Sequence, residues 1–301
     1  MIEFCTRCEY MRSVYFRPYS GERLCSKCFN ETIVEKVKRT INRFSMFEYD
    51  NRIAVGVSGG KDSLTLLKIL WGIEKEQPKS ELIALFIDEG IDGYRDEALS
   101  IASSFCRNIG VEIHIKSFDE LFDETMDDIA ARDRELGTCS YCGVLRRKAL
   151  NQSAIEIGAD RLATGHNLDD MAQSVLLNIL RGDIQRIEAF EPGGKELESY
   201  VRRVKPLCEI PERETTFYAY INELDFQNTP CPYASEAMRS DVRGFLNRME
   251  VKRPGTKYSV YQTGVKLNTS DEDQMTINKC KICNAPTTGD ICRACELTRK
   301  E

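Results

Sequence analysis

The sequence predicts an α/β protein built on a doubly wound parallel sheet, with a small four-cysteine module at each end. Three observations support this fold class. Apolar strand patterns alternate with helix patterns through the middle of the chain. A turn rich in glycine and serine joins the first of these strands to a helix. Eight of the thirteen cysteines form paired C-x2-C motifs near the two ends.

Composition sets the broad class. At 301 residues the chain can hold one α/β domain of about 200 residues with small appendages. Its start, MIEFCTRCEY, lacks a signal pattern, and no apolar run is long enough to cross a membrane, so we expect a cytoplasmic protein. The net charge of −6 argues against indiscriminate binding of nucleic acid. Basic clusters such as Arg146–Lys148 and Arg202-Arg203 with Lys205 are compatible with an RNA partner, although each cluster is also typical of a solvated helix face.

The terminal cysteines have the spacing of structural zinc sites. The first module spans residues 1–32 and the last spans 273–301. Two residues between cysteines let both thiolates bind one metal, and four thiolates leave no open coordination position. A rubredoxin-like iron or redox dithiols are the alternatives. The ligands would be Cys5, Cys8, Cys25 and Cys28 in the first module, and Cys280, Cys283, Cys292 and Cys295 in the last.

A phosphate site is predicted where the apolar strand 53–57 meets the helix that includes Leu64–Leu70. Backbone N–H groups and a helix N-terminus point at one place in such a turn. Glycines allow a phosphate to approach, the two serine hydroxyls can donate hydrogen bonds, and the lysine adds positive charge. The order of residues is not that of a Walker A loop. The turn reads Ser58-Gly59-Gly60-Lys61-Asp62-Ser63. It resembles the PP-loop of the ATP pyrophosphatases, which cleave ATP between its α and β phosphates.

The remaining strands and helices complete a domain over residues 33–226. Strands are expected at 82–87, 111–115 and 161–164, and helices at 95–107, 119–135, 141–157 and 171–180. Ligands of open parallel sheets bind outside the carboxyl ends of the strands. We therefore expect Ser58–Ser63, Asp88–Gly90 and Gly165–Asp170 to meet in one crevice. Residues 227–272 predict short helices and an extended linker that carries Cys231.

Three further cysteines stand apart from the terminal pairs: Cys139, Cys142 and Cys231. The C-x2-C could be a redox dithiol or half of a zinc site, but three cysteines also suit a metal centre with one open position. The first two open a helix, where its dipole and Arg146 and Arg147 would favour thiolates. Cys106 and Cys208 are alternative partners, the first of them more typical of a core residue.

Taken together, these motifs resemble the TtuA/NcsA family of tRNA 2-thiouridine synthetases. The resemblance is carried by SGGKDS, C-x2-C-G followed by Arg-Arg, GHNLDD, Thr-Pro-Cys-Pro-Tyr and a zinc motif at each end. It implies an oxygen-sensitive iron–sulfur cluster held by Cys139, Cys142 and Cys231. A [4Fe–4S] cluster with three such ligands would keep one iron free for the transferred sulfur, whereas a [3Fe–4S] cluster would lack that iron.

The resemblance also implies a reaction sequence. ATP would place its phosphates on Ser58–Ser63 and its adenosine near Ile87, Asp88 and Gly165, with Mg²⁺ on the phosphates. The O2 atom of a tRNA uridine would attack the α-phosphate, and sulfide would then displace AMP from C2. Lys61 and Arg146 or Arg147 would stabilise the developing charge. Asp170, beside Asp169, is the candidate for binding magnesium or orienting a base, unless the pair only caps its helix.

The sequence is also compatible with other functions. A tRNA-isoleucine lysidine synthetase shares the PP-loop but needs no cluster. A small-molecule PP-loop amidotransferase would not explain the zinc modules. A zinc-ribbon RNA-binding protein with an inactive nucleotide fold is the non-enzymatic alternative. If the protein is a tRNA thiolation enzyme, wobble position 34 is favoured over position 54 as the modified uridine. The sulfur donor would be sulfide or a ubiquitin-like protein thiocarboxylate. Related enzymes suggest a homodimer.

Overall fold

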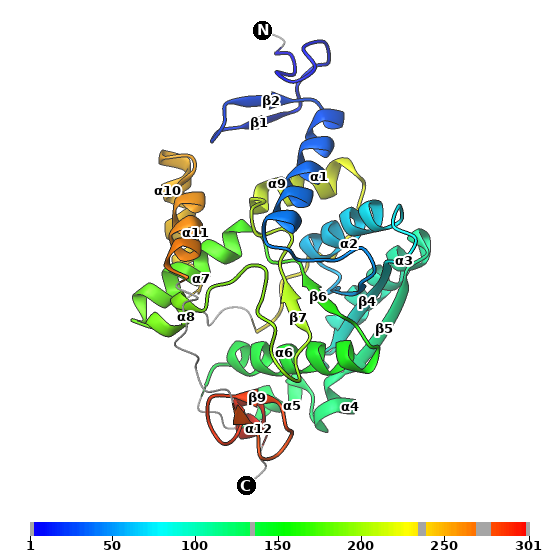
Figure 1. Cartoon of the computed structure of the whole chain (residues 1–301), viewed down its shortest axis with the longest axis vertical. Coiled ribbons are helices and arrows are strands. Elements are labelled where there is room, and N and C mark those ends of the chain that lie inside the picture. The colour runs from blue at the N-terminus through cyan, green and yellow to red at the C-terminus, as the bar shows by residue number, and fades with distance from the viewer. Residues whose placement is uncertain (1–2, 133–135, 234–238, 269–277, 299–301) are drawn as a thin grey trace.

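A five-stranded parallel sheet lies at the centre of the computed structural model, which describes residues 3–132, 136–233, 239–268 and 278–298. The strand order is β5-β4-β3-β6-β7, and each neighbouring pair is parallel (Figure 1). The strands are β3 (Arg52–Gly56), β4 (Glu81–Asp88), β5 (Glu112–Ser117), β6 (Arg161–Thr164) and β7 (Arg202–Val204). The predicted doubly wound parallel sheet is confirmed.

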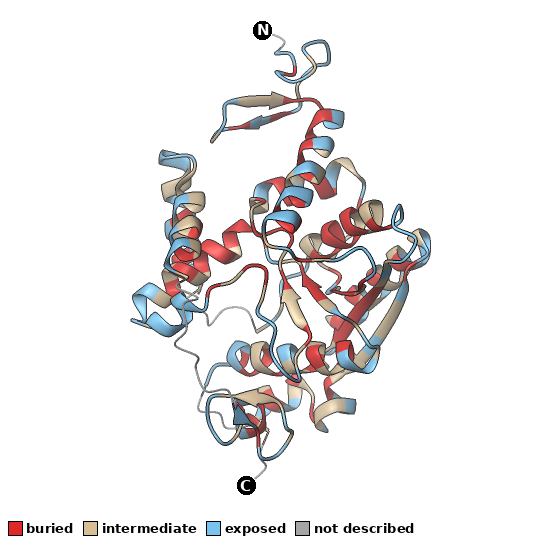
Figure 2. Ribbon diagram, viewed as in Figure 1, coloured by how far each residue is buried: buried red, intermediate tan, exposed pale blue. Residues whose placement is uncertain are grey.

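Helices cover both faces of the sheet, because successive side chains of a strand point to opposite faces. Ile53 and Val55 of β3 lie in the core shared with α2 and α3, whereas Ala54 between them packs with α6. Figure 2 shows the buried residues concentrated in the sheet and on the helix faces turned toward it. These helices are α2 (Lys61–Glu74), α3 (Arg95–Ile109) and α6 (Thr138–Glu156).

A second group of helices extends the fold beyond β6 and β7. In it α7 packs against both α10 and α11. The group consists of α7 (Leu168–Leu180), α8 (Ile184–Glu188), α10 (Arg239–Lys252) and α11 (Thr256–Leu267), whereas α9 (Glu212–Ile221) packs against α2. The predicted extension over 227–272 thus supplies two helices, while its residues 234–238 and 269–272 lie outside the described ones. Within the described residues, no helix is long and apolar enough to cross a membrane.

The two cysteine modules lie at opposite ends of the molecule (Figure 1). The N-terminal module is a hairpin followed by a long helix, and the predicted domain boundary at 32/33 falls inside that helix. Its elements are β1 (Tyr15–Arg17), β2 (Glu22–Leu24) and α1 (Ser26–Arg43). The C-terminal module contains β8 (Asn278–Lys279), β9 (Pro286–Thr287) and α12 (Arg293–Leu297). Residues 273–277 and 299–301 of this predicted module lie outside the described ones.

Two expectations about local structure were wrong. The single solvated helix expected over 119–135 is two short helices, α4 (Phe118–Phe122) and α5 (Met126–Ala131), and each begins with a capping box. Buried Met126 and Ile129 show that the acidic stretch is anchored to the core, and 133–135 lie outside the described residues. The basic pair Arg202-Arg203, expected on a helix face, lies in β7. An edge strand so rich in charge has no apolar run by which to find it.

A buried charge cluster joins the N-terminal module to the main domain. Arg17 of β1 donates to both carboxylate oxygens of Glu214 on α9, at 2.9 and 3.1 Å. Both side chains are almost fully buried, at 2% and 1% exposure. Lys36 of α1 lies 3.6 Å from the same carboxylate, and the Tyr19 hydroxyl donates to it. This cluster fixes the module through fully desolvated charges, which are costly to separate.

Glu214→Gln should lower the free energy of unfolding by about 3–5 kcal/mol, because it leaves Arg17 buried beside a neutral group. Urea denaturation measures this change. The matched control is Glu35→Gln, which breaks the Arg7–Glu35 pair, whose side chains are 37% and 52% exposed. That loss should stay below about 1 kcal/mol. Equal effects of the two substitutions would contradict the proposed weight of the buried cluster.

Candidate active site at the carboxyl ends of the strands

The glycine- and serine-rich turn between β3 and α2 is held in shape by its own hydrogen bonds. The Ser58 backbone N–H donates to the Ser63 hydroxyl oxygen at 3.1 Å, and that hydroxyl donates to the Gly60 carbonyl at 2.9 Å. Gly59 has a φ of +78°, and a Cβ on it would lie 2.7 Å from the carbonyl oxygen of Ala98 on α3. Only glycine fits this position.

The N-terminus of α2 is open for an anion. Its N-cap residue is Gly60, which offers no side chain to cap the first N–H groups. These groups and the positive end of the helix dipole can therefore bind a phosphate. Ser58 and Ser63 border the same space with hydroxyl donors.

A cavity of about 270 Å³ lies beside this turn. Its lining includes Ser58 from the turn, Ile87 from β4 and Gly165 after β6. Gly165 allows the end of β6 to approach α2 closely, since a Cβ on it would lie 3.0 Å from the Ser63 nitrogen. The three strand ends that the sequence assigned to one crevice thus meet in the structure.

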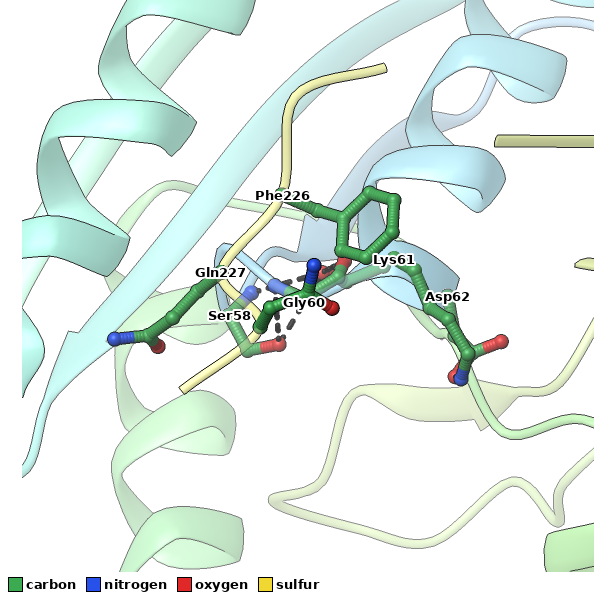
Figure 3. Close-up of a pocket in the computed structure, with 8 residues that line it drawn as sticks. Ser58, Gly60, Lys61, Asp62, Phe226 and Gln227 are labelled. Atoms are coloured by element: carbon green, nitrogen blue, oxygen red, sulfur yellow. Dashed lines mark hydrogen bonds and ion pairs between the residues drawn. The ribbon is translucent and has the colours of Figure 1, made fainter. Parts of the chain in front are cut away.

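A second cavity of about 270 Å³ borders the same turn (Figure 3). The segment Phe226–Asn228 forms its other wall. The Gln227 backbone N–H donates to the Gly59 carbonyl at 3.0 Å, and the Gln227 side chain donates to the Tyr94 carbonyl at 2.6 Å. This segment continues to Cys231, so it connects the phosphate turn to one of the three central cysteines.

The charged residues of the turn are engaged with α9. Lys61 Nζ lies 2.7 Å from an oxygen of Asp62 and 3.0 Å from an oxygen of Glu212. Burial lowers the pKa of Lys61, but these two carboxylates outweigh it and raise the pKa overall. Asp62 also accepts a hydrogen bond from the Thr215 hydroxyl. Lys61 therefore stays a cation beside the turn and is held in place by a helix distant in sequence.

The turn after β4 uses Asp88 and Glu89 differently. The Asp88 carboxylate accepts a hydrogen bond from the Gly90 N–H at 2.8 Å, so it closes the turn. Ile87 lines the cavity as expected for a nucleoside contact, and Glu89 lines it where Asp88 was expected. Glu89 is only 4% exposed and was not singled out in the sequence. The only available signal was its place directly after an apolar strand.

Contacts link the central cysteines to this cavity and to each other's segments. Arg146, which lines the cavity, donates from Nη2 to Cys142 Sγ at 2.9 Å. Cys142 and Cys231 pack in the same apolar cluster. Cys139 Sγ lies 3.1 Å from the carbonyl of Tyr233, two residues beyond Cys231. Arg146 thus connects Cys142 to the cavity, and the segment of Cys231 and Tyr233 packs beside Cys139 and Cys142.

The expectation that the helix start and the nearby arginines make Cys142 readily ionised is wrong. Burial raises the pKa of its thiol, and this effect and the nearby Glu89 outweigh the lowering by Arg146. The helix start alone does not decide the charge of a side chain that faces the core. A metal ion would reverse this, because ligand binding itself displaces the thiol proton.

The alternative ligands Cys106 and Cys208 belong to another part of the core. Both are fully buried among the apolar residues that include α2 and α3, apart from the cluster that holds Cys142. Cys208 Sγ lies 3.4 Å from the Tyr261 hydroxyl oxygen. Burial raises the pKa of Cys106 to about 11 and that of Cys208 to about 12. Neither is placed to join the central cysteines.

The two aspartates at the start of α7 have separate tasks. Asp169 is 3% exposed, and its carboxylate accepts bonds from Lys257 and from the Glu212 N–H, so it braces α9 and α11. Asp170 lines the cavity and also completes a capping box with Asn167. Burial raises the pKa of Asp170 to about 6, although Arg239 lies 3.8 Å away and lowers it. Asp170 is therefore the member of the pair that faces the cavity.

Another residue of the cavity lining, His166, lies close to several positively charged side chains. His166 accepts or donates a hydrogen bond at the Thr164 hydroxyl, 2.9 Å away. Its crowded surroundings and the nearby Lys205 and Arg203 lower the pKa of His166 to about 3, so it is neutral at physiological pH. Glu89 and His166 lay within the segments Asp88–Gly90 and Gly165–Asp170 that were expected at the crevice, but neither side chain was predicted to have a role. Arg95, Leu150, Thr164 and Arg239 were not predicted to line it.

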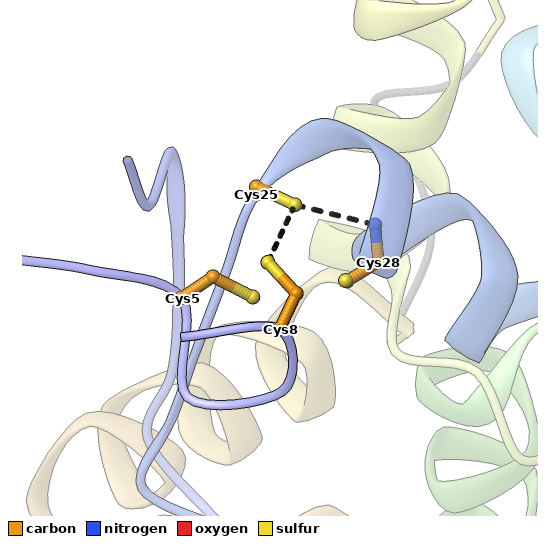
Figure 4. A group of neighbouring side chains, drawn as sticks. All are labelled: Cys5, Cys8, Cys25 and Cys28. Carbon is orange, nitrogen blue, oxygen red and sulfur yellow. Dashed lines mark hydrogen bonds between the residues drawn. The ribbon is translucent and has the colours of Figure 1, made fainter. Parts of the chain in front are cut away.

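Each terminal module brings four cysteine sulfurs together, all within 4.8 Å of one another. Figure 4 shows the N-terminal group, in which Cys25 also accepts a hydrogen bond from the Cys28 N–H at the start of α1. In the C-terminal group, Cys295 Sγ lies 3.5 Å from Lys148 Nζ on α6. Four thiolates in this arrangement fit a tetrahedral zinc ion. Zinc in both groups stays a prediction.

Comparison with known proteins shows the family to which the chain belongs. The sequence model of the PP-loop domain matches residues 30–250. The chain belongs to the PP-loop family. This PP-loop protein is 38% identical over 292 residues to a probable sulfurtransferase of Methanocaldococcus jannaschii, covering 93% of this chain and 83% of the relative. It is 36% identical to cytoplasmic tRNA 2-thiolation protein 1 of Dictyostelium discoideum, over 99% of this chain and 83% of the relative.

A solved structure extends the likeness of this PP-loop protein to the whole fold. The U34-tRNA thiolase NcsA from Methanococcus maripaludis, described with its [4Fe-4S] cluster, superposes with a TM-score of 0.88 at 36% identity. The match covers 99% of this chain and 96% of that one. The resemblance to the TtuA/NcsA family is therefore confirmed, and the structural match extends over nearly the whole chain.

Replacing one C-terminal cysteine should remove one of the two zinc ions that the paired modules predict. Cys280→Ser should lose that metal and lower the thermal midpoint, because the thiolate shell would be incomplete. Zinc per chain is measured by mass spectrometry of the purified protein. Cys106→Ser, at a buried cysteine outside both modules, should keep full zinc. Unchanged zinc in Cys280→Ser would exclude a four-thiolate site there.

Asp170 predicts a pH-dependent stability difference. Its pKa is about 6 in the folded chain against an ordinary value near 3.8. The folded state therefore binds the proton more tightly, and the stability this contributes is present below about pH 4 and lost as pH rises through about 6. Asp170→Asn, which cannot ionise, should gain thermal stability relative to the parent chain as pH rises from about 4 to about 6, and the difference should then stay constant up to pH 8. A difference that does not change with pH would contradict this expectation.

Proposed function

We propose that this PP-loop protein is a tRNA 2-thiouridine synthetase that adenylates the O2 atom of a uridine and then replaces that oxygen with sulfur. The observation that carries the proposal is that Arg146, which lines the cavity at the phosphate-binding turn, also donates to Cys142, one of the three central cysteines. The relatives named tRNA 2-thiolation protein and U34-tRNA thiolase support it.

The first half of the reaction uses the phosphate turn. The turn and the N-terminus of α2 would bind the ATP phosphates, with the nucleoside beside Ile87 and Gly165. The uridine O2 atom attacks the α-phosphorus, a P–O bond forms, and pyrophosphate leaves with the electron pair of the bond that breaks. Lys61 is the cation beside the turn that would bind the phosphates, and Arg146 would stabilise only the charge that develops in the transition state at the α-phosphorus. Asp170, ionised above about pH 6, would bind magnesium or orient the reacting groups.

The second half needs a sulfur carrier, and the central cysteines fit one. Cys139, Cys142 and Cys231 supply three soft ligands, as an iron–sulfur cluster with one unligated iron requires. When bound, such a cluster supplies the iron on which the sulfur to be transferred is held. Arg146, donating to Cys142 Sγ, would stabilise the negative charge of the thiolate ligands. Sulfur enters at C2, and AMP leaves with the former uridine oxygen.

The substrate and partners follow from this chemistry. A uridine must enter with its base splayed from the loop, as single-stranded RNA elements allow. The relative described as a U34-tRNA thiolase favours wobble position 34 over position 54. Sulfide or a ubiquitin-like thiocarboxylate would supply the sulfur, and we expect a homodimer in the cytoplasm.

The decisive experiment measures iron, sulfide and product on protein reconstituted without oxygen. We expect about four irons with matching acid-labile sulfide in addition to zinc, AMP as the nucleotide product, and 2-thiouridine in the tRNA. Cys142→Ser should lose the iron and the thiolation. Cys106→Ser is the matched control and should keep both, because Cys106 lies in the core away from the cavity.

Two results would contradict the proposal. Full thiolation by Cys142→Ser would remove the cluster from the mechanism, and ADP as product would remove adenylation. Conversion of ATP to AMP with tRNA but without iron would indicate a sulfur-free tRNA-modifying enzyme of the lysidine-synthetase type.

A further inference from the structure

A buried carboxylate links the phosphate turn to the central cysteines. Glu89 is 4% exposed and follows β4 at the carboxyl edge of the sheet. Its Oε1 lies 2.9 Å from Arg146 Nε, and its Oε2 lies 2.6 Å from Arg95 Nε. In the described part of the chain, neither arginine pairs with another carboxylate. One negative charge therefore holds two guanidinium groups that would otherwise repel each other.

Arg95 carries this link to the phosphate turn. It is 5% exposed and begins α3. Its Nη1 donates to the Ser58 carbonyl at 3.2 Å, and its Nη2 donates to the Ile87 carbonyl at 2.9 Å. The guanidinium also lies over the Phe86 ring, 4.5 Å from the centroid. Arg95 thus ties the phosphate turn to the end of β4 through a rigid, planar group.

Arg146 carries the link to the sulfur side. Its Nη2 donates to Cys142 Sγ at 2.9 Å, while its side chain is 46% exposed at the cavity. Packing alone does not hold so exposed an arginine, and fixing its rotamer costs up to about 2 kcal/mol. The contact with Glu89 offsets that cost and selects the conformation that reaches Cys142.

We propose that Glu89 is a positioning residue that aligns the two halves of the reaction. It would hold Arg146 at the central cysteines and Arg95 at the phosphate turn, and it would act only through these two arginines. The proposal rests on the proposed function, in which ATP binds at the turn and a cluster binds at the cysteines. As a consequence, one carboxylate controls both nucleotide affinity at the phosphate turn and iron retention at the central cysteines, although these two sites share no ligand.

Three variants of the reconstituted protein separate the two links. The measurements are the Kd for α,β-methylene-ATP with magnesium and the rate at which a chelator removes iron. Arg95→Lys should weaken nucleotide binding on the order of tenfold and leave iron release unchanged, since lysine cannot reach both carbonyls. Arg146→Gln should speed iron release and leave nucleotide binding unchanged. Glu89→Gln should do both.

A double-mutant cycle tests whether Glu89 acts through Arg146. In the Arg146→Gln background, Glu89→Gln should add nothing to the rate of iron release. An equal effect of Glu89→Gln with and without Arg146 would overturn the proposal, as would a Glu89→Gln protein that keeps parental values for both measurements.

The matched control is Glu124→Gln. Glu124 is a 10% exposed carboxylate that lies 2.7 Å from Arg132 and lines neither cavity. It should lower the thermal midpoint without changing nucleotide affinity or iron release, and a change in either would assign the Glu89 effects to general destabilisation. If Glu89→Gln does not fold, the other two variants decide: each must alter its own end alone, and any other pattern overturns the link.

This experiment reads binding and iron retention, neither of which requires catalysis. A protein that binds nucleotide and iron as expected but forms no 2-thiouridine would contradict the proposed function while the positioning role is still measured.

Discussion

Backbone contact at two glycines is the constraint on which the site depends. At Gly59 the phosphate turn touches the backbone of α3, and at Gly165 the end of β6 touches the first turn of α2, so that a Cβ at either position would lie within 3.0 Å of neighbouring atoms. These contacts bring three strand ends and a helix N-terminus to one cavity. The anion site is consequently made of main chain, and side chains from other elements are left to supply charge around it. Any residue larger than glycine would separate the elements that must converge.

The electrostatics of the cavity follow from the charged side chains that lie close together around it. The pKa of Asp170 is raised to about 6 and that of His166 is lowered to about 3, so both shifts favour the neutral form of the side chain. The Glu89 carboxylate raises the pKa of Arg146 further above its ordinary value. Three guanidinium groups, those of Arg95, Arg146 and Arg239, line the cavity and would attract a polyphosphate. A bound magnesium ion would favour the ionised form of Asp170, whereas the phosphates would oppose it.

Much of the fold and part of the site could be predicted because their signals are local. The turn at Ser58–Ser63 and the apolar strand 82–87 depend on neighbouring residues, and the cysteine pairs identify themselves by spacing. The roles of Asp88, Glu89 and Asp169 could not be predicted, because three carboxylates at strand or helix ends look alike until tertiary contacts assign their partners. Asp169 meets Lys257, which is distant in sequence, and nothing local marks that pairing. Strand β7 was not predicted for a related reason, because an edge strand that contains two arginines shows no alternating apolar pattern.

The terminal modules are parts of the site's support rather than appendages. The C-terminal cysteines pack in the same apolar cluster as Cys142, and Lys148 of α6 reaches Cys295. At the other end, Arg17 binds Glu214 on α9, the helix whose Glu212 and Thr215 contact Lys61 and Asp62 of the phosphate turn. Each module therefore braces one half of the cavity, the N-terminal one the phosphate side and the C-terminal one the sulfur side. A metal bound in either module would stabilise the helix that carries the reactive residues, because short segments of this kind depend on their metal to fold. The two cysteine modules are thus joined mechanically to the phosphate turn through α9 and to the central cysteines through α6.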